Sequence, residues 1–378
     1  MAMKNVFLCL LFLTLPFWFL SGCKKDTNSS DPTNTNAELI GKLEAVSDSV
    51  LNAANLHIPG MVALVVDKNK GIDWLYTGGI SDIPNSIPVN ADLTFRIGSN
   101  TKTMTGTVLL QLVDEGMLKL EDTLSKFFPS FPRADSITIS MLCNMTSGYL
   151  NYSDVFVFVD SMIKNPTNVW QPMELLNYAF DQDTNFYFPV GTDFHYSNTN
   201  TIILGLLIEQ LTGTSLKTQI TNRIFAPLAL QNTGFLTSGT EFPGPHGRGY
   251  YFQNYIPGDD YTSHFDMSWA WAAGSAYSTP RELQKYVEAL VEGSYLTSGL
   301  QQRRLTEMRD IGIGKYGLCL FQRGSFYGHN GGCPGFTSSM YHSLSRNCTI
   351  IIYFNCQLSY IPDNLFLRYV DILYGKDF

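Results

Sequence analysis

The sequence predicts an α/β protein of the α+β kind, in which segments from both ends of the chain build one sheet. Three observations predict it. Short runs of strand character lie near residues 60–80 and again between residues 316 and 355. Helical periodicity dominates the residues between them, and amphipathic segments flank the strands at both ends. The simplest fold with this order is a sheet flanked by N- and C-terminal helices, with a mostly helical domain inserted.

Composition and charge exclude two classes of protein. Hydrophobic residues make up 44% of the 378 residues, which is enough to bury a large core, so wholesale disorder is ruled out. The formal net charge is −8 and the isoelectric point is about 5.2. A nucleic-acid partner would require a basic surface to neutralise phosphates, and we therefore expect none.

The elements are expected at definite places along the chain. In the first part, residues 38–56 have helical spacing, the run MVALVV after Pro59-Gly60 reads as a strand, and GIDWLYTGG as its return strand. Further helices are expected at 99–120, 199–211, 214–226 and 280–292, short strands at 316–322, 325–329, 336–342 and 348–355, and a last helix at 362–373. We therefore assign residues 37–90 and 310–378 to the sheet domain and 91–309 to the helical domain.

The N-terminus reads as a targeting segment. Val6 to Leu20 is almost entirely apolar but shorter than a membrane-spanning helix, and it ends in Leu20-Ser21-Gly22-Cys23. This looks like a bacterial lipobox, with residues 1–22 as a lipoprotein signal peptide and Cys23 as the lipidated residue. The polar residues 23–36 would be a flexible tether. We expect a lipoprotein held on a membrane of the cell envelope; an ordinary signal peptide or a short membrane anchor is the alternative.

Five cysteines remain once Cys23 is set aside for lipid: Cys143, Cys319, Cys333, Cys348 and Cys356. We expect mostly free, buried thiols, and one cross-strand disulfide stays open. No C-x-x-C motif and no zinc-like spacing of His and Cys occurs, so no metal site is expected.

The first motif that can carry chemistry is Ser99-Asn100-Thr101-Lys102, at the start of a predicted helix. Residues i and i+3 share one face of a helix, so the lysine amine can reach the serine hydroxyl. The helix N-terminus disfavours a positive charge there, and a neutral lysine can take the serine proton. Taken alone, the pattern is more often a helix cap beside a solvated lysine, and it recurs at Ser161-Lys164.

Two more short motifs follow, and each has an ordinary structural explanation. Tyr196-Ser197-Asn198 precedes an apolar helix, where a core tyrosine and a helix-capping asparagine would look the same. His329-Asn330-Gly331-Gly332 lets a ligand approach the backbone closely, but a glycine-rich turn would also read this way. Lys315-Tyr316-Gly317 is a competitor one strand earlier.

Together and in this order, the motifs resemble those of the serine β-lactamases and penicillin-binding proteins, in the branch of class C β-lactamases, D-alanyl-D-alanine carboxypeptidases and related serine esterases. The blocks FRIGSNTKTMTG, FPVGTDFHYSNTN and YGHNGGCPGF carry the resemblance, which runs from about Gly60 to the C-terminus. It implies the β-lactamase/transpeptidase-like fold with an antiparallel sheet, and no metal or organic cofactor.

The resemblance also implies roles for single residues. Ser99 would be the acylated nucleophile, Lys102 its proton acceptor, and Tyr196 the group that protonates the leaving group and activates water. Asn198, and His329-Asn330-Gly331, would bind the substrate. The backbone N–H groups of Ser99 and Gly332 would form the oxyanion hole.

The sequence departs from the family pattern in its third motif. Many relatives carry Thr at the middle position and Thr or Ser after its Gly, where their hydroxyls help to hold a substrate carboxylate. Here those positions are Asn330 and Gly332. Binding of a free carboxylate is therefore in question.

Three functions follow from these observations. The leading one is a membrane-anchored serine hydrolase that forms an acyl-enzyme and acts on D-alanyl-D-alanine-type peptides or β-lactams. The second is an esterase or D-amino-acid amidase of the same family, and the changes at Asn330 and Gly332 favour it somewhat. The third is a non-catalytic, surface-binding lipoprotein, against which the joint presence of Ser99, Lys102, Tyr196 and His329 argues.

Overall fold

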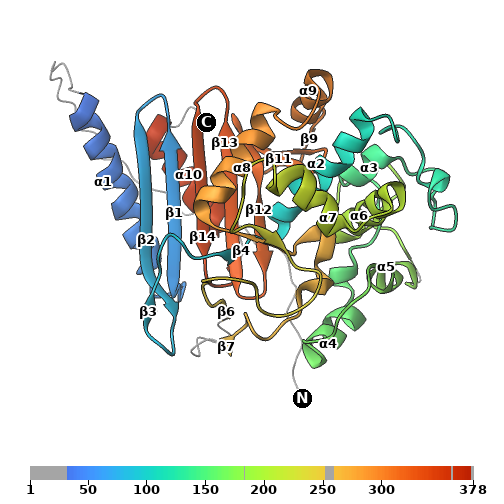
Figure 1. Cartoon of the computed structure of the whole chain (residues 1–378), viewed down its shortest axis with the longest axis horizontal. Helices are drawn as coiled ribbons and strands as arrows, with labels where there is room; N and C mark the ends of the chain where they lie inside the picture. Colours follow the sequence, from blue (N-terminus) through green and yellow to red (C-terminus); the bar gives the residue numbers. More distant parts are fainter. Residues whose placement is uncertain (1–31, 183, 252–258, 359–360, 376–378) are drawn as a thin grey trace.

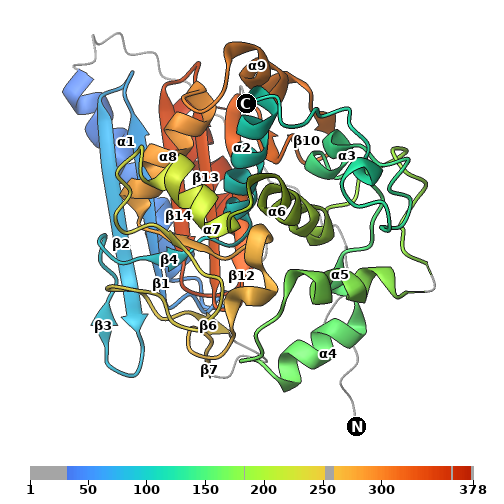
Figure 2. The ribbon, with the colours of Figure 1, turned by 45° about the vertical axis from the view of Figure 1, so that its right-hand side comes forward.

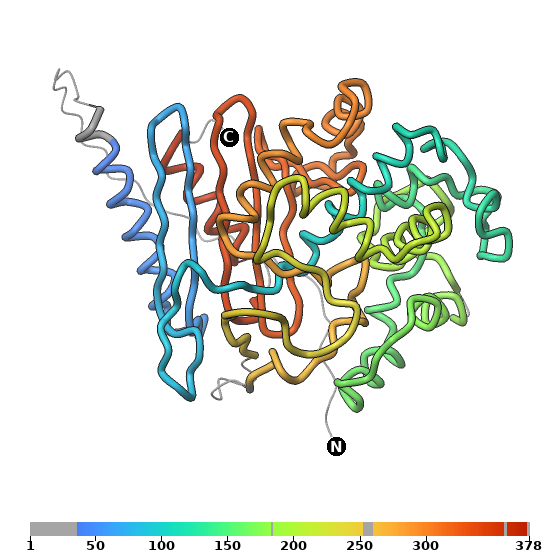
Figure 3. Tube along the Cα trace, viewed as in Figure 1, coloured from blue at the N-terminus to red at the C-terminus, as the bar shows by residue number. Residues whose placement is uncertain are grey.

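The computed structural model describes residues 32–182, 184–251, 259–358 and 361–375. Within them, one nine-stranded antiparallel sheet has the order β3-β2-β1-β14-β13-β12-β11-β10-β9. Its strands are β1 (Gly60–Asp67), β2 (Ile72–Asp82), β3 (Ile87–Pro88), β9 (Arg309–Asp310), β10 (Lys315–Gly317), β11 (Leu320–Arg323), β12 (Phe326–Cys333), β13 (Phe336–Ser343) and β14 (Cys348–Phe354). β1 pairs with β14, so both ends of the chain meet in one sheet, as the adjacent blue and red traces of Figure 3 show. The predicted fold class is confirmed.

Helices cover both faces of this sheet, which explains the unbroken apolar run in β1. Met61, Ala63 and Val65 point into the core under α1 (Pro32–Leu51) and α10 (Ile361–Tyr374). The alternating Val62, Leu64 and Val66 point into the core on the opposite face, where α8 (Pro280–Glu292) lies (Figure 1). Side chains alternate along a strand, so a strand buried on both faces is apolar throughout.

Two predicted boundaries are wrong. Helix α1 begins at Pro32, so residues 32–36 of the predicted tether are helical; proline is tolerated in the first helical turn, whose N–H groups have no partner. Helix α8, which we placed in the inserted domain, packs on β13 and β14. The side chain of Thr279 caps it and Pro280 begins it, and its apolar stripe faces the sheet. Residues 1–31, with Cys23, lie outside the described residues.

The helical part packs beside the sheet. Its elements are α2 (Thr101–Asp114), α3 (Ile139–Cys143), α4 (Phe156–Lys164), α5 (Pro172–Phe180), α6 (Asn198–Thr212) and α7 (Leu216–Ile220), followed after α8 by α9 (Ser298–Thr306). Helices α2 and α6 lie side by side and contact each other (Figure 2). Most of their residues are buried. A small sheet with the order β4-β8-β5 joins this part to the main sheet through β4 (Phe95–Arg96), β8 (Ala276–Ser278) and β5 (Gly234–Phe235).

The strands near the third motif differ from the expected ranges. The run 316–322 is not one strand but the hairpin β10–β11, which turns at Cys319 with a φ of 56°. Strand β12 continues to Cys333 and pairs with β13 over its whole length, so the third motif lies in a strand and not in a turn. The glycines weakened the strand signal, because Gly has low strand propensity.

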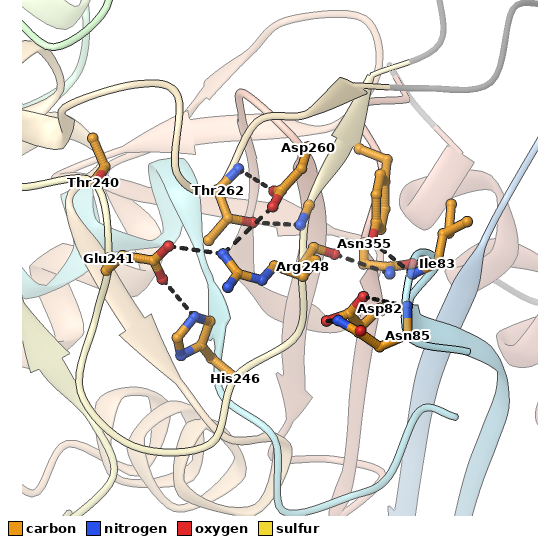
Figure 4. A network of polar contacts seen from close by, with 12 residues as sticks. Asp82, Ile83, Asn85, Thr240, Glu241, His246, Arg248, Asp260, Thr262 and Asn355 are labelled. Atoms are coloured by element: carbon orange, nitrogen blue, oxygen red, sulfur yellow. Dashed lines mark hydrogen bonds and ion pairs between the residues drawn. The ribbon is translucent and has the colours of Figure 1, made fainter. Parts of the chain in front are cut away.

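A polar network fastens the segment around β6 (Tyr250–Tyr251) and β7 (Asp259–Asp260) to the sheet (Figure 4). The Arg248 guanidinium pairs with Glu241 at 2.7 Å and with Asp260 at 3.4 Å. The amide of Asn355 donates to the Arg248 carbonyl at 3.0 Å. In the described part of the chain, no helix is both long and apolar enough to cross a membrane.

Candidate active site

Ser99 lies in a tight turn between the sheet and helix α2. The 3₁₀ turn Gly98–Asn100 leads directly into Thr101, the first residue of α2. Gly98 has a φ of 51°, in the left-handed region that favours glycine. The Asn100 side chain donates to the Ile97 carbonyl and to the Ser338 hydroxyl, both at 2.8 Å, and so ties the turn to β13. Ser99 therefore has a fixed position at the N-terminus of α2.

Lys102 is fully buried one turn later and reaches Ser99. Its Nζ lies 3.0 Å from Ser99 Oγ and 2.8 Å from the carbonyl oxygen of Ala273. Burial lowers the Lys102 pKa to about 7, with a smaller opposing effect of Cys319. At neutral pH a large fraction of this amine is unprotonated, and it is positioned to take the serine proton.

Tyr196 places its ring over the Lys102 amine, whose Nζ lies 4.8 Å from the ring centroid. The phenol oxygen is buried and makes no hydrogen bond of ordinary length with the described residues. Burial raises the Tyr196 pKa well above its usual range, and the neighbouring Ser99 hydroxyl opposes this only partly. Tyr196 is thus held as a neutral phenol beside the serine, in a form that can donate a proton.

His329 faces the same centre from β12 but is neutral. Burial lowers its pKa to about 3, and the nearby Lys102 adds to the effect. Its Nε2 lies 3.3 Å from the hydroxyl of Tyr316 on β10. His329 can therefore bind a substrate through hydrogen bonds but not through a positive charge.

The remaining residues of the third motif differ in what they can do. A Cβ at Gly331 would lie 1.9 Å from the Ile97 carbonyl oxygen, so Gly331 lets β12 pass against the Ser99 turn. A Cβ at Gly332 would meet only Thr337, at 3.8 Å. The same backbone approach brings Gly332 N next to Gly98, so the two expected oxyanion-hole N–H groups come from adjacent segments.

The side chain of Asn330 reaches helix α10. Its amide donates to the buried carboxylate of Asp363, which also pairs with Arg323 at 3.2 Å and accepts from the Tyr341 hydroxyl at 3.2 Å. One of the two amide hydrogens expected for substrate binding is therefore already used. No sequence signal indicated Asp363, because it contacts β12 only through the folded chain.

Asn198 begins helix α6 and does not line the cavity beside Ser99. Its Nδ2 donates to the Ser153 hydroxyl at 2.9 Å, and its Oδ1 is buried without a partner among the described residues. That oxygen has room for one hydrogen bond, and its contact with a substrate amide stays a prediction.

A cavity of about 300 Å³ opens directly on Ser99. It is lined by Ser99, Phe194, Tyr196, Ile311, Ile313, Tyr316, Phe321, His329 and Asn330. A second cavity of about 260 Å³ shares Asn330 with the first and is also lined by Gly332, Gln357 and Asp363. Among the described residues no lysine or arginine lines either cavity.

The competing motifs do not build such a site. Lys164 of the second S-x-x-K pattern is exposed on α4 and pairs with Asp160 at 2.7 Å. Lys315 of the K-x-G competitor is exposed, although its neighbour Tyr316 reaches His329. In the described part of the chain, no group of His, Cys, Asp and Glu could hold a metal ion.

The Beta-lactamase family model matches residues 38–367 of this chain. The chain belongs to the beta-lactamase family. The protein flp of Staphylococcus aureus strain NCTC 8325 is 28% identical over 325 residues, which cover 81% of this chain and 61% of flp. The putative penicillin-binding protein PbpX of Bacillus subtilis strain 168 is 25% identical, over 76% of this chain and 67% of PbpX.

Solved structures share this fold. The D-stereospecific amidohydrolase from Streptomyces sp. superimposes with a TM-score of 0.77 at 28% identity, over 87% of this chain and 98% of that one. The D-amino acid amidase from Ochrobactrum anthropi SV3 has a TM-score of 0.78 at 23% identity, over 89% and 99%. This chain therefore belongs to the beta-lactamase family by its fold as well as by its sequence.

Proposed function

We propose that this chain cleaves amides or esters through an acyl-enzyme on Ser99, and that its preferred substrates carry no free carboxylate beside the bond that breaks. The observation that carries the proposal is the contact of Ser99 with a buried lysine under a cavity without cationic side chains. The contact supports catalysis and argues against a non-catalytic binding protein.

The substrate class follows from the electrostatics of the two cavities. Peptides that end in D-alanyl-D-alanine and β-lactams present a carboxylate, which a site recognises with a cation or with several donors. Here His329 is neutral, Asn330 donates to Asp363, and Gly332 has no hydroxyl. The structure thus favours the amidase or esterase alternative over carboxypeptidase or β-lactamase activity. The similar structure from Streptomyces sp. is a D-stereospecific amidohydrolase, so D-amino-acid amides are the substrates to test first.

Two substrates that differ in one group test the substrate class. We expect kcat/KM for an N-acyl-D-alanyl-D-alanine amide to exceed that for the free acid by at least about tenfold, a difference of ~1.4 kcal/mol in transition-state binding. A preference for the free acid would refute the proposed class. The Gly332→Ser variant adds a hydroxyl in open space, and we expect it to narrow the difference.

Probe labelling separates the wider alternatives. We expect a fluorophosphonate to label the folded protein more strongly than a fluorescent penicillin. Strong labelling by penicillin would instead favour carboxypeptidase or β-lactamase activity. Absence of both labels on folded protein would support the non-catalytic alternative.

We further propose that the protein is a lipoprotein of the bacterial cell envelope, attached to a membrane through lipid on Cys23. The proposal is based on the apolar run and on the residues Leu20-Ser21-Gly22-Cys23. The attached domain would then act on small substrates outside the cytoplasm.

A further inference from the structure

Two buried cysteines from distant parts of the chain meet behind the active site. Cys143 is the last residue of α3, and Cys319 forms the turn between β10 and β11. The backbone N–H of Cys319 donates to the Cys143 carbonyl at 2.9 Å. A side-chain hydrogen bond with Cys319, together with burial, raises the Cys143 pKa well above its usual range. Both side chains are fully buried. Within the described residues, no other cysteine contributes to the pKa shifts of Cys333, Cys348 and Cys356.

A buried arginine lies beside this pair. The Arg304 guanidinium donates to the Thr107 hydroxyl at 2.8 Å and to the Thr103 carbonyl at 3.2 Å, and within the described residues it forms no ion pair with a carboxylate. A buried cation is costly without an anion. A hydrogen bond with Cys143, together with the nearby Arg304 and Lys102, lowers the Cys319 pKa, although burial opposes this. The Cys143 pKa is raised, so Cys319 is the more readily deprotonated of the two thiols.

We propose that Cys143 and Cys319 form a disulfide that joins helix α3 to the β10–β11 turn behind the active-site lysine. The 2.9 Å hydrogen bond from Cys319 N to the Cys143 carbonyl, with the covalent bonds on either side of it, keeps the two Cα atoms within ~7 Å of each other. That limit is close to the ~4.4–6.8 Å that a disulfide spans, so the bond requires little movement of the backbone.

The oxidant is a disulfide, either of a small thiol or of an envelope oxidoreductase. The Cys319 thiolate attacks one of its sulfurs, which breaks that S–S bond, releases one thiol and leaves a mixed disulfide. Cys143 then loses its proton and attacks the Cys319 sulfur, which releases the second thiol. Two electrons pass from the cysteines to the oxidant. Both cysteines are buried, so exchange takes place during folding or when the hairpin β10–β11, near the edge of the sheet, opens.

The bond would also change the surroundings of the proposed base. Cys319 packs closely against Gly106: a Cβ built on Gly106 would lie only 2.4 Å from the Cβ of Cys319. Gly106 lies one helical turn after Lys102. Negative charge at Cys319 raises the Lys102 pKa. A disulfide carries no charge, so oxidation removes this effect of Cys319 on the Lys102 pKa. This part of the inference rests on the proposed function; the bond itself does not.

Cysteine mapping tests the bond without any substrate. The full chain is unfolded, reduced, and refolded either with reduced and oxidised glutathione or with dithiothreitol; it is then unfolded in acid and alkylated with N-ethylmaleimide. We expect two fewer labels after refolding in glutathione, and one cross-linked peptide that joins Cys143 to Cys319. Equal labelling under both conditions, or a link between other cysteines, would overturn the proposal.

Two variants and a thermal scan complete the test. Cys143→Ala should lose the difference in labelling, while Cys348→Ala, which removes another buried thiol, should keep it. Oxidised wild type should have a Tm at least ~5 °C above the reduced protein, because the bond closes a long loop. If Cys143→Ala does not fold, the peptide map of the wild-type chain still decides the question.

Discussion

At the scale of single residues, Lys102 determines what this site can do. The residue is buried against a serine hydroxyl, a backbone carbonyl and the face of an aromatic ring. Its amine is charged in water, and burial without a carboxylate partner lowers its pKa to about 7. A base of this kind works near neutral pH, whereas Tyr196, with its raised pKa, remains a proton donor.

We predict that Lys102→Arg is as inactive as Lys102→Ala. Guanidinium does not lose its proton in proteins, so arginine cannot accept the Ser99 proton. Each variant should lose at least the ~10²–10⁴ in kcat/KM typical of a general base. The measurement is kcat/KM on one activated ester, with circular dichroism to confirm folding. An arginine variant within about tenfold of wild type would show that Lys102 supplies charge and not basicity.

The pH dependence of kcat/KM should follow the same residue. Below about pH 7 the amine becomes protonated and can no longer act as a base, so kcat/KM should fall tenfold per pH unit on the acidic side. His329, with a pKa of about 3, should add no step between pH 5 and 9. A profile of wild type and His329→Gln checks this: a limb near pH 7 that disappears in His329→Gln would assign the titration to the histidine.

At the scale of elements, strand β12 brings the two halves of the site together. It runs beside the Ser99 turn, with Gly331 against the Ile97 carbonyl and Gly332 toward the cavities. Side chains at adjacent positions of a strand would point to opposite faces of the sheet. Gly331 and Gly332 therefore lack a side chain for different reasons.

A matched pair of substitutions separates these reasons. Gly331→Ala places a methyl group 1.9 Å from a backbone oxygen, and we expect a cost of about 1–3 kcal/mol or more in the free energy of unfolding. Gly332→Ala meets open space and should stay within ~0.5 kcal/mol of wild type. Denaturant unfolding of both proteins measures the difference. Equal stabilities would show that β12 does not approach the turn so closely.

The sequence was informative about this region only in part. Local spacing predicted that Lys102 can reach Ser99, because i and i+3 on a helix lie on one face whatever surrounds them. The role of Tyr196 was implied by the family resemblance and not by spacing. The sequence did not predict the partners that decide chemistry, such as Ala273, Tyr316 and Asp363, since these reach the site only through tertiary packing. The glycines of β12 could equally indicate a turn, because the close approach of this strand to the Ser99 turn leaves no periodic pattern in the sequence.

At the scale of the whole molecule, the fold class could be predicted because the hydrophobic periodicity identifies strands and helices, and their order along the chain limits the possible folds. The division of the chain was predicted less well. Helix α8 belongs with the sheet, although 91–309 reads as one helical stretch, because sequence pattern shows that a helix has an apolar face but not which surface that face covers.

The expected attachment to a membrane is a property of the whole protein. We predict that Cys23→Ala leaves the membrane fraction or accumulates unprocessed. One acyl chain binds a membrane only marginally, so the mature cysteine should carry more than one. Phase separation in detergent measures the effect. Wild-type protein in the aqueous phase would contradict the lipoprotein prediction.

The central claim is that Ser99 is the nucleophile of this chain. After reaction with a fluorophosphonate, intact-mass analysis should show one adduct, and peptide mapping should locate it on Ser99. Ser99→Ala should remain folded and lose the adduct. Ser161→Ala, which changes the other S-x-x-K match on α4, should keep it. An adduct that survives in Ser99→Ala, or one on Ser161, would contradict the account.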